Sequence, residues 1–96
     1  MNTLQRVMTW YASNCNEDWE HSFGIKIDTL DNPGWRVQVD IVETDLERKP
    51  FDEVDIQRST DDWVYCAVSE GVFNGAGGTV NLDELLKIFL NWAEHS

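Results

Sequence analysis

Three groups of residues in this sequence are of types that can do chemistry, and the first is Asp18-Trp19-Glu20-His21. Carboxylates beside a histidine can transfer protons or bind a metal ion. Such a site needs further ligands that converge on it, and the only other histidine is His95. In a strand, Glu20 and His21 would point to opposite faces of the sheet. We therefore expect the entry of a loop into a strand here, with Trp19 packed and His21 hydrogen-bonded, rather than an active site.

The second group is the run Asn74-Gly75-Ala76-Gly77-Gly78, which precedes Asn81-Leu82-Asp83-Glu84. A glycine-rich turn that leads into a helix can bind phosphate through its backbone N–H groups. This run lacks the lysine and the serine or threonine of a Walker motif, and its spacing is not GxGxxG. Asp83 and Glu84 would also occupy the first helical turn, where an anion would bind. The run is therefore predicted to be a flexible break that connects a strand to a helix.

The third group consists of the two cysteines, Cys15 and Cys66. They are far apart and form no CxxC motif, so both are predicted to be free thiols. Cys66 falls in the middle of an apolar strand pattern and is expected to be inert core. Cys15 falls in a polar stretch without basic neighbours that would activate it. No Ser-His-Asp or Cys-His set stands out, so we predict no catalytic residue, no metal site and no cofactor.

Apolar periodicity predicts a helix at each end of the chain. Near the beginning, apolar residues recur with the spacing of one helical face, at Leu4, Val7, Met8 and Tyr11. Asn2 or Thr3 can cap this helix, which should end near Asn14. A second helix should begin after Asn81 as its cap, with Glu84 three residues later. Its apolar stripe is longer and comprises Leu82, Leu85, Leu86, Phe89 and Ala93.

Between the two helices, the apolar period changes to two, which is typical of strands. Two alternating runs, 23–30 and 35–41, flank the turn Asp31-Asn32-Pro33-Gly34 and predict an antiparallel hairpin. A third strand is predicted around 54–57. A fourth is predicted at 63–68, and its two apolar faces favour a central position or cover on both sides. We expect one α+β domain over residues 1–96: a four-stranded antiparallel sheet with both helices on one face, in two layers.

The charge of the chain is lopsided, with 18 acidic and 7 basic residues and a formal net charge of −11. Nine carboxylates lie between Asp40 and Asp62, and only three basic residues offset them. Such charge repels nucleic acid and anionic membranes and attracts a basic partner. Trp63 and Tyr65 could add aromatic anchors. The candidate partner-binding residues are Glu43, Asp45, Glu47, Asp52, Glu53, Asp55, Asp61, Asp62, Trp63 and Tyr65. The alternative is a solvated face that keeps the protein soluble.

The sequence also allows predictions about the compartment and the oligomeric state of the protein. No apolar run approaches the roughly 20 residues that a membrane span needs. Residues 1–6 lack the features of a signal peptide, so we expect a cytoplasmic protein. A monomer is favoured over a dimer, because acidic residues on a sheet edge oppose pairing of two copies.

Several motifs together resemble the immunity protein 53 family. They are Trp10-Tyr11, Trp19-Glu20-His21, Gly24-Ile25-Lys26-Ile27, Thr29-Leu30-Asp31-Asn32-Pro33-Gly34-Trp35, Asn74-Gly75-Ala76-Gly77-Gly78 with Asn81-Leu82, and Phe89-Leu90-Asn91-Trp92. The resemblance spans nearly the whole chain. It implies an antidote from a bacterial polymorphic-toxin or contact-dependent system, which binds a cognate toxin domain. It implies no catalytic residues.

The sequence is therefore compatible with three functions. The first is an immunity protein that binds a toxin domain, such as a basic nuclease, stoichiometrically through an acidic surface. The second is an acidic mimic of nucleic acid that regulates a basic host protein. The third is an enzyme or small-ligand protein that uses Asp18–His21.

Overall fold

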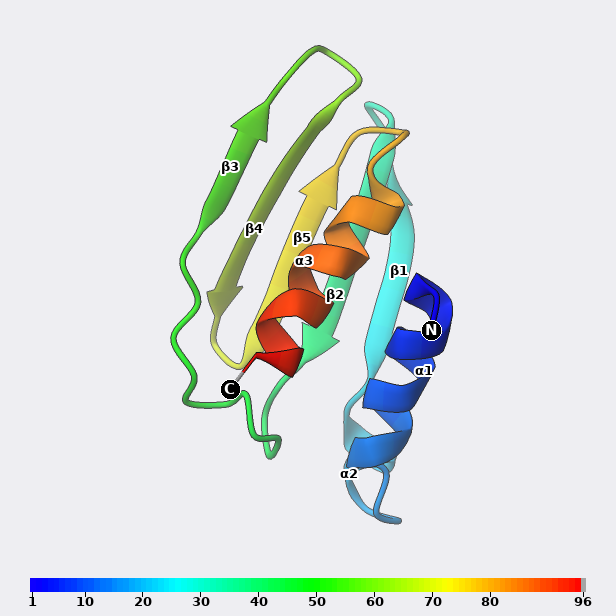
Figure 1. The fold of residues 1–96 in the computed structure, drawn as a ribbon, viewed down its shortest axis with the longest axis vertical. Helices are drawn as coiled ribbons and strands as arrows, with labels where there is room; N and C mark the ends of the chain where they lie inside the picture. The colour runs from blue at the N-terminus through cyan, green and yellow to red at the C-terminus, as the bar shows by residue number, and fades with distance from the viewer. Residues whose placement is uncertain (96) are drawn as a thin grey trace.

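The computed structural model describes residues 1–95 as an α+β fold (Figure 1). The fold class is confirmed, but the sheet has five strands rather than the predicted four. In chain order the elements are α1 (Thr3–Asn14), α2 (Trp19–Ser22), β1 (Ile25–Leu30), β2 (Gly34–Asp40), β3 (Val54–Gln57), β4 (Trp63–Ser69), β5 (Val72–Gly77) and α3 (Leu82–Glu94).

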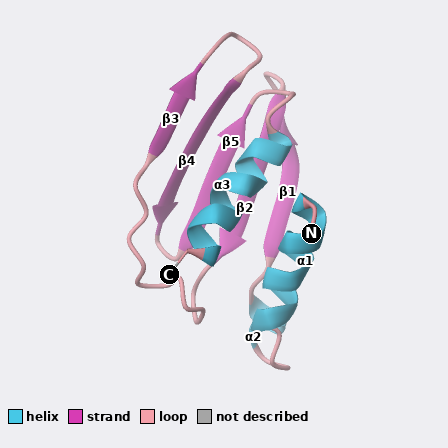
Figure 2. Ribbon diagram, viewed as in Figure 1, coloured by secondary structure: helices cyan, strands magenta, loops and turns pink. Residues whose placement is uncertain are grey.

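The sheet is antiparallel throughout, in the order β1-β2-β5-β4-β3. The predicted hairpin is confirmed as β1 and β2, and β4 lies inside the sheet as expected. The helices α1 and α3 lie on the same face, with α3 across the central strands (Figure 2). The other face is not covered by any helix among residues 1–95. The outermost strands, which form the two edges of the sheet, are β1 and β3.

The strand that the sequence did not reveal is β5, which contains most of the predicted glycine-rich break. It pairs with both β2 and β4 in the middle of the sheet. A Cβ atom added to Gly75 would lie 3.4 Å from the Leu85 side chain, and one on Gly77 would lie 3.2 Å from it. These glycines therefore let α3 approach the sheet closely. Glycine is normally unfavourable in strands, and here the packing of α3 against the sheet outweighs this low strand propensity.

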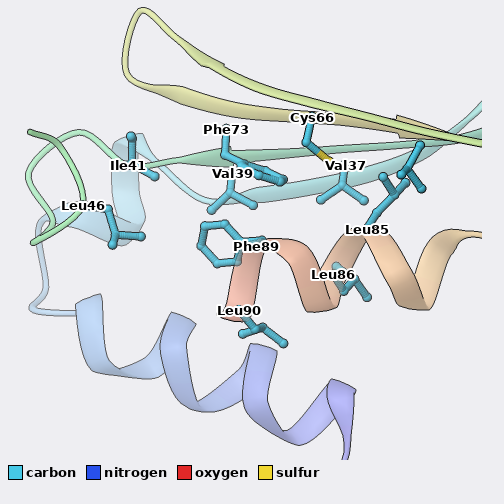
Figure 3. Close-up of a cluster of buried hydrophobic side chains, with 11 residues drawn as sticks. Val37, Val39, Ile41, Leu46, Cys66, Phe73, Leu85, Leu86, Phe89 and Leu90 are labelled. Carbon is cyan, nitrogen blue, oxygen red and sulfur yellow. The ribbon is translucent and has the colours of Figure 1, made fainter. Parts of the chain in front are cut away.

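The core lies between the central strands and α3 (Figure 3). Val37 and Val39 of β2 and Phe73 of β5 are at most 1% exposed, and they meet Leu85 and Phe89 of α3. The ring of Phe73 packs against three other aromatic rings, those of Phe51, Phe89 and Trp92. These T-shaped and stacked ring contacts fix how the helix, the sheet and the segment before β3 fit together.

Both cysteines are free, as predicted. Cys66 lies on β4 and is fully buried in the core. Burial raises the pKa of its thiol to about 12, because the thiolate would lose its hydration. Cys15 follows α1 and is exposed. The expectation of an inert core thiol at Cys66 therefore agrees with its surroundings.

The first helix packs differently from the prediction. It begins after Asn2, whose side chain accepts a hydrogen bond from the Gln5 backbone N–H. It contacts α3 partly through Arg6, whose guanidinium lies 2.8 Å from the Glu94 carboxylate. No residue of α1 is buried, and two members of the predicted apolar stripe, Leu4 and Met8, are 64% and 60% exposed. The stripe is thus covered by the rest of the chain only in part, since Val7 packs against the core.

The segment Asp18–His21 was expected to enter a strand, but it forms the short helix α2 instead. Trp19 is buried as predicted, at 2% exposure. Glu20 accepts hydrogen bonds from the backbone N–H groups of Asn16 and Glu17, which closes the turn before α2.

None of the helices described for residues 1–95 combines the length and apolar character that a membrane crossing requires.

Candidate functional site

The segment that connects β2 to β3 carries most of the predicted partner-binding acids, and buried side chains hold it in place. Ile41 and Leu46 point into the core and are at most 3% exposed. The indole N–H of Trp19 donates to the carbonyl of Val42 at 2.9 Å. A long loop that is pinned at several points has little conformational freedom to lose when it binds a partner.

The far end of the same segment is attached to the C-terminal end of α3. The indole N–H of Trp92 donates to the carbonyl of Pro50 at 2.9 Å. The ammonium group of Lys49 donates to the carbonyls of Trp92 and His95 and lies 5.8 Å from the centre of the Trp92 ring. Carbonyls at a helix C-terminus lack partners within the helix, so a cation there satisfies them and interacts well with the helix dipole.

Replacement of Lys49 by methionine should lower the free energy of unfolding by about 1 kcal/mol, because the carbonyls at the end of α3 lose a charged donor. Urea unfolding followed by tryptophan fluorescence would measure the change. Arg48→Met is the matched control, since Arg48 is exposed and forms none of the hydrogen bonds or ion pairs found among residues 1–95. Equal losses in the two variants would contradict a specific role for Lys49.

Six exposed carboxylates follow this segment and the adjoining strand β3 along one side of the molecule. We call them the acidic edge: Glu43, Asp45, Glu47, Asp52, Glu53 and Asp55. Only two of them accept hydrogen bonds among the described residues. Glu47 accepts the backbone N–H of Glu43 at 2.7 Å, and Glu53 accepts the hydroxyl of Tyr65 at 2.9 Å. The other carboxylates are free to meet a partner.

Most of the protein's basic side chains are engaged away from the acidic edge, although Arg48 lies within the same segment and forms no ion pair with any described residue. Arg6, Arg36, Arg58 and Lys87 form all five ion pairs found among residues 1–95. None of the carboxylates in those pairs belongs to the acidic edge. Within the segment itself, Lys49 is held by backbone carbonyls. The result is an excess of negative charge at one edge of the sheet.

Tyr65 extends the acidic edge onto the open face of the sheet. It lies on β4 directly opposite Asp55 of β3 and is 38% exposed. The hydrogen bond to the Glu53 carboxylate, together with partial burial, raises the pKa of the Tyr65 phenol above its ordinary value. Trp63 projects to the same open face as Tyr65, since residues two apart on a strand share a face, and it is half-buried. Both aromatic side chains therefore lie on the open face of the sheet.

The remaining two acidic candidates, Asp61 and Asp62, lie apart from the acidic edge. They are in the turn that follows β3 and joins it to β4 (Figure 1). Asp62 is neutralised by Arg58, which also binds Glu84 at the start of α3 at 2.7 Å. The amide of Asn81 binds both carboxylates. Hydrogen bonds from Asn81 and then Arg58 lower the pKa of Asp62, and those from Arg58 lower the pKa of Glu84. This network fastens the turn to α3.

The other residues that could do chemistry are not gathered into a site. His21 is exposed, and its ring makes no hydrogen bond among the described residues, contrary to the expectation. Over residues 1–95, no three His, Cys, Asp or Glu side chains come together as a metal site would require. The N-terminal turn of α3, where a phosphate would have to bind, is occupied by the Asn81, Asp62 and Glu84 network.

The sequence did not reveal what holds the segment 41–53 in place. Leu46 and Phe51, two of its apolar residues, are isolated and match neither a helical nor a strand period. Their neighbours in space, Trp19 and Trp92, are more than twenty residues away in the chain. Isolated large apolar residues within an otherwise polar stretch were the one local signal that this loop is packed.

The sequence model that describes immunity protein 53 matches residues 4–94 of this chain. The chain matches no curated protein and no solved structure. The matched range includes the whole acidic edge and every helix and strand described above, except for Thr3, the first residue of α1. By this match over nearly its full length, the chain belongs to the immunity protein 53 family.

Proposed function

We propose that this protein neutralises a cognate bacterial toxin domain in the cytoplasm by binding it stoichiometrically through the acidic edge, with Tyr65 and Trp63 as aromatic anchors. Membership of an immunity protein family supports toxin neutralisation in general. The observation that carries the finer proposal is the acidic edge itself. It consists of six exposed carboxylates, four of them without a partner among residues 1–95, on β3 and on a segment that is pinned to the core.

A basic partner follows from this charge. Proteins that hold nucleic acid carry clusters of lysine and arginine that contact phosphates. Opposite charge on an inhibitor accelerates encounter with such a protein by 10 to 10³-fold at low ionic strength. The acidic edge could occupy the phosphate-binding groove of a nuclease and exclude its substrate. Inhibition of this kind needs no catalytic residue and no cofactor.

The fixed shape of the segment supports tight as well as rapid binding. Long loops usually lose conformational entropy when they bind, and this loss weakens the complex. Here the indole donors of Trp19 and Trp92 and the Lys49 ammonium already fix the backbone. Tyr65 adds a partly exposed ring next to Glu53 and Asp55, which is the kind of group that anchors interfaces.

The experiment that tests this function uses the toxin domain encoded immediately upstream of this gene. Calorimetric titration should give one toxin domain bound per chain, and co-expression should restore growth of cells that produce the toxin. Binding should survive moderate salt, because aromatic anchors add to the charge. If the folded protein neither binds nor rescues, the proposal is wrong. Salt-sensitive binding to several unrelated basic proteins would instead favour an acidic mimic of nucleic acid.

A further inference from the structure

The sheet edge formed by β1 lies on the other side of the molecule from the acidic edge (Figure 1). The side chains of Leu4, Met8 and Tyr11 on α1 and Ile27 on β1 are exposed there, between 37% and 64%. Beside them an apolar groove of about 340 Å³ runs between α1 and β1, lined by Val7, Met8, Tyr11, Gly24 and Ile25. Such a patch on one side of an otherwise charged protein marks an interaction surface.

The backbone of β1 is also free to pair along this edge. The carbonyl of Gly24 accepts the N–H of Asp40 on β2 at 3.0 Å. In an antiparallel pair, every second residue directs its N–H and C=O toward the neighbouring strand. The groups of Ile25, Ile27 and Thr29 therefore point away from β2, toward the open edge. An unprotected edge of this kind is a template for another strand.

We propose that the partner at this edge is a second copy of the protein, which pairs its own β1 in antiparallel fashion about a two-fold axis at Ile27. In this register each Ile27 faces the Ile27 of the second copy, and each Lys26 faces Asp28 of the second copy. The strand is thus complementary to itself in charge, as a two-fold interface requires. The three outward-facing residues Ile25, Ile27 and Thr29 supply the inter-strand hydrogen bonds.

The side chains of β1 fit this arrangement on both faces of the sheet. Ile27 lies opposite Val37, a core residue, so its side chain projects to the face that carries α1. The two Ile27 side chains would therefore meet beneath the α1 helices and continue the apolar groove. Lys26 and Asp28 project to the open face, and Lys26 forms none of the ion pairs found among residues 1–95. It is available to Asp28 of the second copy.

The distribution of charge permits two copies to join here despite the net charge of −11. Asp28 is already neutralised by Arg36 at 2.7 Å, and Lys26 offsets it further. The acidic edge lies at the opposite end of the strand order, so the two acidic edges of the dimer would be as far apart as the sheet allows. The sequence favoured a monomer because acids were expected at sheet edges. That reason applies to β3 and not to β1, whose charges alternate.

Sedimentation equilibrium of the full chain, from low micromolar to submillimolar concentration, tests this inference without any toxin, so its outcome is separate from that of the proposed function. The wild type should approach about 22 kDa, twice the 11.1 kDa of one chain. Ile27→Lys should stay at the mass of one chain, because two like charges would face each other at the axis. Ile56→Lys is the matched control, on the other edge strand with similar exposure, 38% against 43%.

A wild type that remains at the mass of one chain over the whole range would overturn the inference. So would an Ile27→Lys variant that still dimerises, or an Ile56→Lys variant that loses the dimer equally. Circular dichroism would show whether each variant is folded. If Ile27→Lys does not fold, Lys26→Glu takes its place, since it sets a second acid beside Asp28 of the second copy. An undiminished dimer in that variant would also refute the pairing.

Discussion

Replacement of Asp45, Asp52 and Asp55 together by asparagine should slow association with the toxin domain about tenfold at low ionic strength, with a much smaller change in dissociation. The three carboxylates are exposed and make no ion pair or side-chain hydrogen bond among residues 1–95. Their removal should therefore leave the fold unchanged. Stopped-flow association at several salt concentrations would measure the effect, which should shrink as salt screens the charges.

The control for this variant keeps the same total charge. Glu17→Gln with Asp18→Asn and Asp31→Asn also removes three exposed acids, so both triple variants carry −8, from −11 plus 3. These residues lie in the α1–α2 loop and the β1–β2 turn, away from the acidic edge. If both variants slow association equally, only the net charge matters. If neither does, the acidic edge does not guide binding.

A second large effect should follow from Gly78→Ala, which we expect to lower the free energy of unfolding by about 3 kcal/mol. A Cβ atom at this position would overlap the carbonyl oxygen of Asp61 and lie 2.7 Å from its carbonyl carbon. Neither backbone can move easily, because the Gly78 N–H donates to the Trp63 carbonyl at 3.1 Å. The Arg58 and Asn81 network holds the other side of the turn. Chemical denaturation would measure the loss.

Gly24→Ala is the matched control for this prediction. A Cβ atom on Gly24 would meet nothing within 4 Å, so its unfolding free energy should change by no more than about 0.5 kcal/mol. A comparable loss in both variants would mean that alanine acts through the backbone in general. The close approach at Gly78 would then not be the cause.

Several elements of the fold could be predicted from local sequence alone. The alternation on both sides of Asp31–Gly34 predicted the β1–β2 hairpin, because a half-buried strand exposes every second residue. The position of Asn81 and the apolar stripe after it predicted α3, which begins at Leu82, although the Asn81 side chain does not cap the helix as expected. The clustered carboxylates predicted a charged surface, although not its shape. Motifs along the chain were also enough to indicate the family.

Local sequence was insufficient where residues distant in the chain decide the outcome. The Leu4–Tyr11 stripe has the period of a buried face, yet α1 turns Arg6 and Val7 toward α3 and leaves Leu4 and Met8 exposed. Nothing in the periodicity of α1 says which face α3 will contact. The same limit applies to β5, since only its position between β2 and β4 makes a glycine-rich strand favourable.

By itself, the sequence determined the fold class, most of the elements and the excess of negative charge, because each of these is set by residue types and their near neighbours. The tertiary structure alone decided how that charge is divided. The β3–β4 turn places Asp62 beside Arg58, which also binds Glu84 of α3, while Trp19, Trp92 and Lys49 hold the segment that carries most of the other acids. Those contacts join residues far apart in the chain, and such pairings form only when the whole domain packs.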